Sequence, residues 1–185
     1  MTLTNDIKIS SETNITKTYV KYDHITHVKN RPGMYIGSID EDYVETWIYN
    51  NEIKKMEKKK LNYNPGLFKI FDEILVNASD HEIRLKSKKS ENINQMKNIK
   101  VKIDKETSII EVYNDGEGID IIEHPTEKVY IPEMIFGHML SSTNYDDSEE
   151  RTIGGQNGIG AKACNIFSKW FEIFRINSDS QLFQY

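Results

Sequence analysis

The chain has 185 residues, of which 37% are hydrophobic and 29% charged, and its formal net charge is -5. This size and composition predict one globular domain with its own core. They exclude a disordered chain, and the length is too short for two domains of ordinary size. The acidic balance argues against a dedicated DNA-binding module, which usually carries a basic surface, but it leaves DNA open as the substrate of a larger assembly.

The single cysteine and the lack of long apolar runs bear on the compartment. Cys164 lies in an apolar helical pattern, where a buried thiol is expected, and one cysteine cannot form an intrachain disulfide. No N-terminal stretch is typical of a signal peptide, and no apolar run is long enough to cross a bilayer. We therefore expect an intracellular protein that is neither secreted by the usual route nor associated with a membrane.

The first 64 residues are predicted to contain an arm, a short helix and a lysine-rich connection. Residues 1–21 are assigned to a flexible arm, because most of this segment is polar and lacks a hydrophobic period. The stretch KYDHITHVKN predicts a short helix, which Arg31-Pro32-Gly33 ends because proline restricts the residue before it. The run NEIKKMEKKKLNYN, at 51–64, favours a solvated face or a hairpin loop over a DNA contact.

The strongest predicted helix runs from Gly66 to about Lys86. Apolar residues recur along it at spacings of three and four, which places them on one side of the helix: Leu67, Ile70, Phe71, Ile74, Leu75 and Ala78.

A polar stripe borders the apolar side of this helix. Glu73, Asn77, Asp80 and Arg84 fall within about 60° of one another on an ideal helix. A half-buried glutamate there could hold and deprotonate a water, and an asparagine one turn on could offer its oxygen to a hard cation such as Mg²⁺. The same stripe is also typical of an ordinary solvated face with an Asp80–Arg84 ion pair.

The second half of the chain alternates strand and helix patterns. Residues 99–103 and 110–112 alternate apolar and polar side chains around the turn KETS and predict an antiparallel pair. Helices are predicted from Pro132 to Leu140 and from Ala161 to Phe167, and the stretch WFEIFRI predicts a strand. Together these elements predict an α+β sandwich with helices on one face of a mostly antiparallel sheet.

Two glycine-containing motifs leave alternatives open. The stretch Asn114-Asp115-Gly-Glu-Gly118 could be a simple turn, or it could let the backbone approach a planar ligand while the aspartate accepts from an amino group. The stretch TIGGQNGIGAK fits the loose dinucleotide pattern but follows a polar segment instead of a strand. The other interpretation is a glycine-rich loop followed by a helix that begins near Gly160. The N–H groups of this helix start and Lys162 would attract a phosphate.

The order of these motifs resembles the three ATP-site motifs of the GHKL superfamily. Glu73 with Asn77 comes first, then Asp115-Gly-x-Gly118, then the glycine loop that ends at Lys162. Four longer stretches are similar to the ATPase region of eukaryotic-type DNA topoisomerase II: RPGMYIGS, PGLFKIFDEILVNASD, YIPEMIFGHMLSSTNYDD and GGQNGIGAKACNIFS. The resemblance runs from about Tyr22 onward, and it implies a GHKL two-layer sandwich over residues 22–185.

The resemblance also implies a site for ATP and Mg²⁺. Glu73 would be the general base that activates the attacking water, Asn77 would coordinate Mg²⁺, and Asp115 would accept from the adenine amino group. The remaining nucleotide-binding positions would be Asn114, Gly118, Ser142, Thr143, Asn144 and the lid residues Gly155, Gln156, Asn157, Gly158, Ile159, Gly160, Ala161 and Lys162.

Departures from the family pattern and missing parts set the expected activity. At three positions of the lid, this chain has a residue other than the usual one of the family: Ile153, Gln156 and Ile159. In the family, a lysine of the transducer domain and the DNA-cleaving residues come from later domains, which we expect to be missing from this chain. The expectation is a fragment that hydrolyses ATP weakly on its own, within an enzyme that dimerises on ATP and passes DNA through a gate.

Two alternatives are weighed against this expectation. The chain could be a non-catalytic, nucleotide-dependent dimerisation module or a split subunit. A chaperone or histidine kinase of the same superfamily is disfavoured by RPGMYIGS and by the STNYDD stretch. The expected location is the nucleus in a eukaryote, and otherwise the cytoplasm or a virus-infected host cell.

Overall fold

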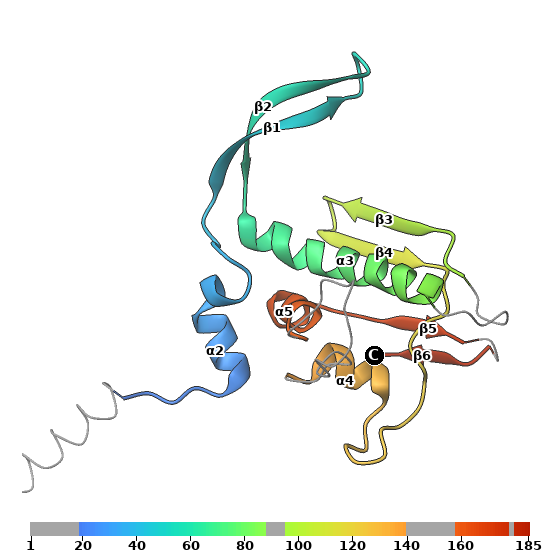
Figure 1. Cartoon of the computed structure of the whole chain (residues 1–185). Helices are drawn as coiled ribbons and strands as arrows, with labels where there is room; N and C mark the ends of the chain where they lie inside the picture. The colour runs from blue at the N-terminus through green and yellow to red at the C-terminus, as the bar shows by residue number, and fades with distance from the viewer. Residues whose placement is uncertain (1–18, 88–94, 140–157, 178–179) are drawn as a thin grey trace, which may run out of the picture.

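The computed structural model describes residues 19–87, 95–139, 158–177 and 180–185. Its described part is an α+β arrangement, as predicted (Figure 1). The helices are α2 (His24–Asn30), the 3₁₀ turn η1 (Pro32–Met34), α3 (Pro65–Ser87), α4 (Ile131–Gly137) and α5 (Gly160–Phe167). The strands are β1 (Asp42–Asn50), β2 (Lys55–Tyr63), β3 (Ile99–Asp104), β4 (Ile109–Asn114), β5 (Phe174–Ile176) and β6 (Leu182–Gln184).

Helix α2 forms where the sequence predicts it. The Asp23 side chain caps its start by accepting from the backbone N–H of Thr26 at 2.9 Å. The hydrogen bond from the Thr26 hydroxyl, at 2.6 Å, and then this backbone bond lower the pKa of the Asp23 carboxyl. The helix ends at Asn30, with Arg31 as its C-cap immediately before Pro32, and it buries Val28 completely.

The lysine-rich run, predicted as a solvated face or a hairpin loop, forms the turn and the exposed second strand of a β-hairpin. Only residues 51–54 form the hairpin turn, while β2 pairs in antiparallel register with β1, a strand that the sequence reading did not predict. The lysines stay exposed on the strand and find partners across it, as in the 2.9 Å ion pair of Lys58 with Glu45. Figure 1 shows this hairpin projecting away from the rest of the chain.

Helix α3 starts at Pro65 because proline suits the first helical position and the Asn64 side chain accepts from Leu67 N–H at 2.9 Å. Its observed bounds agree with the prediction to one residue at each end. Burial is concentrated in its later turns, at Ala78, Asp80 and Leu85. Leu67, which was predicted to lie in the apolar stripe, is 57% exposed.

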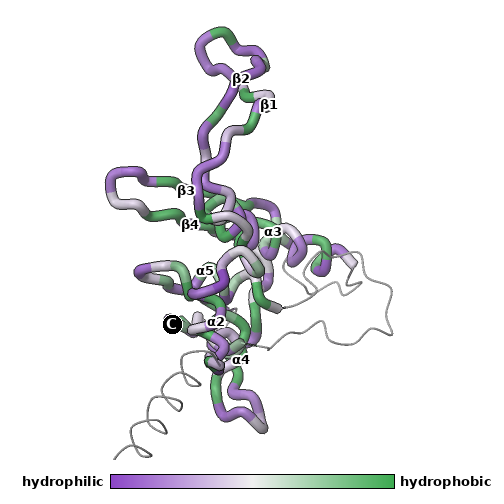
Figure 2. Tube along the Cα trace, turned by 90° about the vertical axis from the view of Figure 1, so that its left-hand side faces the viewer, coloured by the Kyte–Doolittle hydropathy of each residue, from purple (hydrophilic) through white to green (hydrophobic). Residues whose placement is uncertain are grey.

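The strands pair only in antiparallel fashion among the described residues, in three separate two-stranded ladders. The predicted pair 99–103 with 110–112 is confirmed as β3–β4, with Val101 opposite Val112. Figure 2 shows β3 and β4 beside α3, with apolar and hydrophilic residues mixed along both strands.

The predicted strand over WFEIFRI is shorter than expected. Regular pairing begins only at Phe174, because the partner strand β6 spans just three residues. Ile173 extends the ladder by two backbone hydrogen bonds with Tyr185, at 2.9 and 3.2 Å.

The predicted helix from Pro132 is confirmed, but it ends earlier. Helix α4 stops at Gly137 because His138 adopts an extended backbone. Leu140, its predicted end, lies outside the described residues.

Helices α3 and α5 pack side by side and hold the described core. The buried apolar side chains come mainly from α2, α3 and α5 and their flanks: Val28, Ile36, Ala78, Leu85, Met96, Ala161 and Ala163. Within the described ranges, no helix combines the length and apolar character that a membrane span needs.

Candidate functional site

The Glu73 carboxylate lies on the side of α3 that faces α5. Its side chain is 26% exposed, which matches the half-buried position predicted from the polar stripe. The oxygen Oε1 pairs with the Lys69 ammonium, one turn earlier on the same helix. Side chains on a helix lean toward its N-terminus, so a glutamate readily reaches a residue four positions before it.

The other carboxylate oxygen of Glu73 lies against the first residue of α5. Any Cβ at Gly160 would overlap Oε2, so only glycine allows this approach. The predicted first motif on α3 and the last glycine of the third motif are therefore adjacent in space, although 87 positions separate them in the sequence. A carboxylate at the start of a helix also faces N–H groups without helical partners.

Lys162 is buried in the first turn of α5, with 3% of its surface exposed. Its ammonium donates a hydrogen bond to the carbonyl oxygen of Gly158. Burial lowers the pKa of Lys162 to about 8, because removal from water disfavours the charged form. The predicted lid residues that the structure describes, 158–162, thus place a titratable lysine beside the glycines.

Asp115 directly follows β4 and holds the segment before β3. Its Oδ1 accepts from the backbone N–H groups of Lys97 and Asn98, both at 2.8 Å, and its Oδ2 accepts from Asn98 Nδ2 at 2.7 Å. These hydrogen bonds, led by those from Asn98, lower the pKa of Asp115 to about 2. These hydrogen bonds fix the orientation of the carboxylate at the end of β4.

The glycines of the second motif are closely covered by neighbouring side chains. A Cβ at Gly118 would overlap the guanidinium group of Arg175, whose Nε donates to Ile119 O at 3.3 Å. A Cβ at Gly116 would lie 2.8 Å from Leu85 Cδ1. This close packing favours a loop whose conformation is fixed by its neighbours over a turn exposed to solvent.

The other predicted site residues divide into two groups. Asn77 is half-buried one turn after Glu73, and Asn114 ends β4 next to Asp115. Ser142, Thr143, Asn144, Gly155, Gln156 and Asn157 lie outside the described residues.

Three residues near the site were missed by the sequence reading. Lys69 was detectable, because it stands four residues before Glu73 and this spacing brings helix neighbours together. Arg175 and Asn98 carried no local signal, since they reach the second motif from another strand or segment.

Comparisons with known proteins agree with this geometry. The profile of the family described as histidine kinase-, DNA gyrase B-, and HSP90-like ATPase matches residues 62–181, a range that contains all three motifs. The chain belongs to this ATPase family. The GHKL fold and the resemblance stated from the sequence are thereby confirmed.

Within this ATPase family, the chain is similar to proteins named DNA topoisomerase 2. The chain is 51% identical over 161 residues to DNA topoisomerase 2 of Candida albicans, and 51% over 153 residues to that of Saccharomyces cerevisiae. These matches cover 87% and 83% of this chain but 10% of each relative. The chain thus spans about a tenth of the length of the curated relatives it matches.

Solved structures give the same result. The ATPase region of Saccharomyces cerevisiae topoisomerase II matches with a TM-score of 0.77 at 49% identity, over 86% of this chain and 40% of that one. The ATPase and transducer domains of DNA topoisomerase II from Balamuthia mandrillaris match with a TM-score of 0.83 at 42% identity, over 91% of this chain and 41% of that one.

The residues of this ATPase-family site suit a magnesium ion that a nucleotide brings with it. No group of three or more His, Cys, Asp or Glu side chains that could hold a metal occurs in the described part. Mg²⁺ bound with a nucleotide needs few protein ligands, since phosphates and waters supply the others. The Asn77 oxygen, one turn from Glu73, fits this limited role.

Gly160→Ala is expected to disturb the site of this ATPase domain. The new methyl group must displace the Glu73 carboxylate, which is the flexible end of a partly exposed side chain, so the free energy of unfolding should fall by about 1 kcal/mol or less. Chemical denaturation measures this effect. Gly33→Ala is the matched control, because nothing lies within 4 Å of its added Cβ. An equal effect of both substitutions would contradict the close approach of α5 to Glu73.

Proposed function

We propose that this chain binds ATP with Mg²⁺ and hydrolyses it, as the ATPase portion of a type IIA DNA topoisomerase. The observation that carries the proposal is the contact of Glu73 with Gly160, because it joins a candidate base to the glycine-rich start of a helix. Such a helix start attracts phosphate through its N–H groups. The similarity to the topoisomerase II ATPase region supports the choice of nucleotide and of reaction.

The proposed reaction is the attack of water on the γ-phosphate. Glu73 would orient this water and accept its proton, with one carboxylate oxygen free to face the start of α5. The N–H groups of α5 and the Lys162 ammonium would balance the charge of the phosphates. Asn77 would hold Mg²⁺, which supplies charge neutralisation when bound, and Asp115 would accept from the adenine amino group.

The proposed biological role belongs to a longer protein. Nucleotide binding would drive two copies together and close a gate through which one DNA duplex passes, and DNA would contact other parts of the enzyme. Because the relatives are eukaryotic topoisomerases, we propose a nuclear location.

Proton uptake on nucleotide binding tests the proposal. The free chain holds Lys162 with a pKa of about 8, and a phosphate nearby should raise that pKa because it favours the charged form. Calorimetry with Mg²⁺ and a non-hydrolysable ATP analogue, in buffers of different ionisation enthalpy, should therefore show uptake that grows as the pH rises through 8. The affinity should fall over the same range.

The outcomes of this calorimetry separate the parts of the proposal. Lys162→Met should bind more weakly and lose the pH-dependent uptake. Binding with the same uptake in Lys162→Met would contradict the role of Lys162. Absence of any binding by the unchanged chain would overturn the proposed function itself.

A further inference from the structure

The two oxygens of the Glu73 carboxylate have different neighbours. Oε1 pairs with the Lys69 ammonium, and Oε2 lies against Gly160 at the start of α5. A carboxylate can rotate about its last side-chain bond, a torsion with a broad, roughly two-fold preference. A charged partner on one oxygen restricts that rotation and determines where the other oxygen points.

Lys69 is well suited to be this partner. The Glu73 carboxylate, through their hydrogen bond, raises the pKa of Lys69, so the lysine remains a cation over the physiological range. The other nearby carboxylate, Asp72, lies at 3.9 Å from the ammonium and is the weaker partner by distance. Lys69 therefore carries a persistent positive charge that is directed mainly at Glu73.

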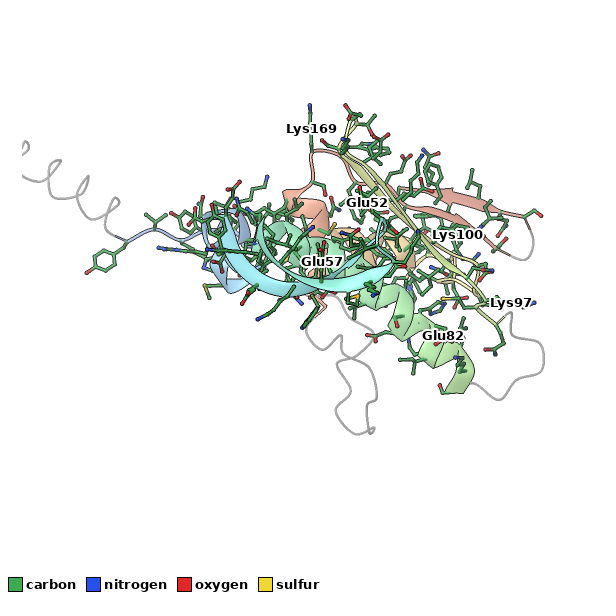
Figure 3. The ribbon with its side chains drawn as sticks, turned by 90° about the horizontal axis from the view of Figure 1, so that it is seen from above. Glu52, Glu57, Glu82, Lys97, Lys100 and Lys169 are labelled. Atoms are coloured by element: carbon green, nitrogen blue, oxygen red, sulfur yellow. The ribbon has the colours of Figure 1, made fainter. Side chains whose placement is uncertain are left out.

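Helix stability does not explain the Lys69–Glu73 pair. A lysine that precedes a glutamate by four residues is the less favourable order on a helix, because it opposes the helix dipole. The same helix contains a pair in the favourable order, Glu82 with Lys86, which begins nine residues after Glu73. Figure 3 labels Glu82 on α3. The two pairs have the same spacing and opposite order, so one helix supplies both a test pair and a control pair.

We propose that Lys69 is a positioning residue for Glu73. By holding Oε1, it keeps Oε2 directed at the first turn of α5, where the attacking water and the γ-phosphate would meet. Lys69 itself touches neither of them. This inference rests on the proposed function, because it assigns the control of that same base.

Steady-state kinetics of ATP hydrolysis test the positioning role. Lys69→Met should lower kcat by about tenfold, the factor that corresponds to the loss of one well-placed interaction with the base, and should leave KM within about twofold. Lys69→Arg should recover most of kcat, since it restores a cation at the same place. The control Lys86→Met, which breaks the pair with Glu82, should behave like the unchanged chain. An unchanged kcat in Lys69→Met, or no recovery in Lys69→Arg, would overturn the inference.

A measurement that does not depend on turnover accompanies the kinetics. In the described part, the Lys69 ammonium faces the Glu73 carboxylate and, at 3.9 Å, the carboxylate of Asp72. The pKa of the Lys69 ammonium, followed by NMR against pH, should fall in Glu73→Gln, because the carboxylate that raises it is lost. The control Glu82→Gln should leave the Lys69 midpoint unchanged.

The two measurements separate failure of the inference from failure of the proposed function. If the unchanged chain neither binds nor hydrolyses ATP, the proposed function fails, and a shifted NMR midpoint would then show only that Lys69 and Glu73 are coupled. The positioning role would fall with the function in that case. A Lys69 midpoint that is the same in Glu73→Gln and in the unchanged chain would overturn the inference even if ATP is hydrolysed.

Discussion

Glu73→Ala is expected to reduce ATP hydrolysis at least a hundredfold, which is about the lower end of what a positioned general base contributes. Binding of the Mg²⁺–nucleotide complex should stay within about threefold, because the carboxylate acts on the water and not on the nucleotide. The fold should tolerate the change, since it relieves the close contact with Gly160 and leaves Lys69 near solvent. Turnover assays and calorimetry on the same preparation measure the two effects.

Glu82→Ala is the matched control for this substitution. Glu82 is on the same helix, is 25% exposed against 26% for Glu73, and also pairs with a lysine. It should hydrolyse ATP like the unchanged chain. Equal losses of binding and of turnover in Glu73→Ala would count against a base role, because they would indicate a general collapse of the site.

Asp115→Asn is expected to weaken the binding of ATP by about tenfold, the effect of losing one hydrogen bond to a charged acceptor. The proposed role of the Asp115 carboxylate is to accept a hydrogen bond from the adenine amino group. The substitution also turns a side-chain amide toward Asn98 Nδ2, where two donors would face each other. A loss of thermal stability should therefore accompany the loss of affinity.

A ligand without a base separates these two effects. Calorimetry of Asp115→Asn with Mg²⁺ and inorganic tripolyphosphate should give an unchanged affinity, since this ligand has no adenine. Asn77→Ala is the comparison variant. It should weaken the binding of both ATP and tripolyphosphate, because the proposed partner of Asn77 is the Mg²⁺ that accompanies either ligand. If Asp115→Asn weakens the binding of ATP and of tripolyphosphate equally, Asp115 acts only through the conformation of its loop. An unchanged affinity for ATP would contradict the assignment of Asp115 to the adenine amino group.

Local patterns predicted the helices well and the strands unevenly. Helix α3 was predicted to within one residue at each end from its long apolar period, and Pro65 with the Asn64 cap fixes its observed start. Strand β2 was not predicted as a strand because four of its nine residues are lysines and its pairing residues lie on β1. Strand β6 was missed because three residues are too few to establish a period.

The candidate site was predicted only in part, because a local pattern reports residues of one element and not contacts between distant segments. The spacing of Glu73 and Asn77 is a property of one helix, so the sequence alone placed both on the same stripe. The contacts that Asp115 makes with Lys97 and Asn98 join segments 17 or 18 positions apart, and no local pattern reports them.

The sequence by itself determined the order of the motifs, the long helix and the resemblance to the ATPase region of topoisomerase II, because each of these depends on neighbouring residues. Only the tertiary structure decided what the motifs contact. It placed Gly160 against one oxygen of Glu73 and Lys69 against the other, and it buried Lys162 so that its pKa falls to about 8. Burial and approach between helices arise from packing, and packing joins residues whose separation in sequence carries no period.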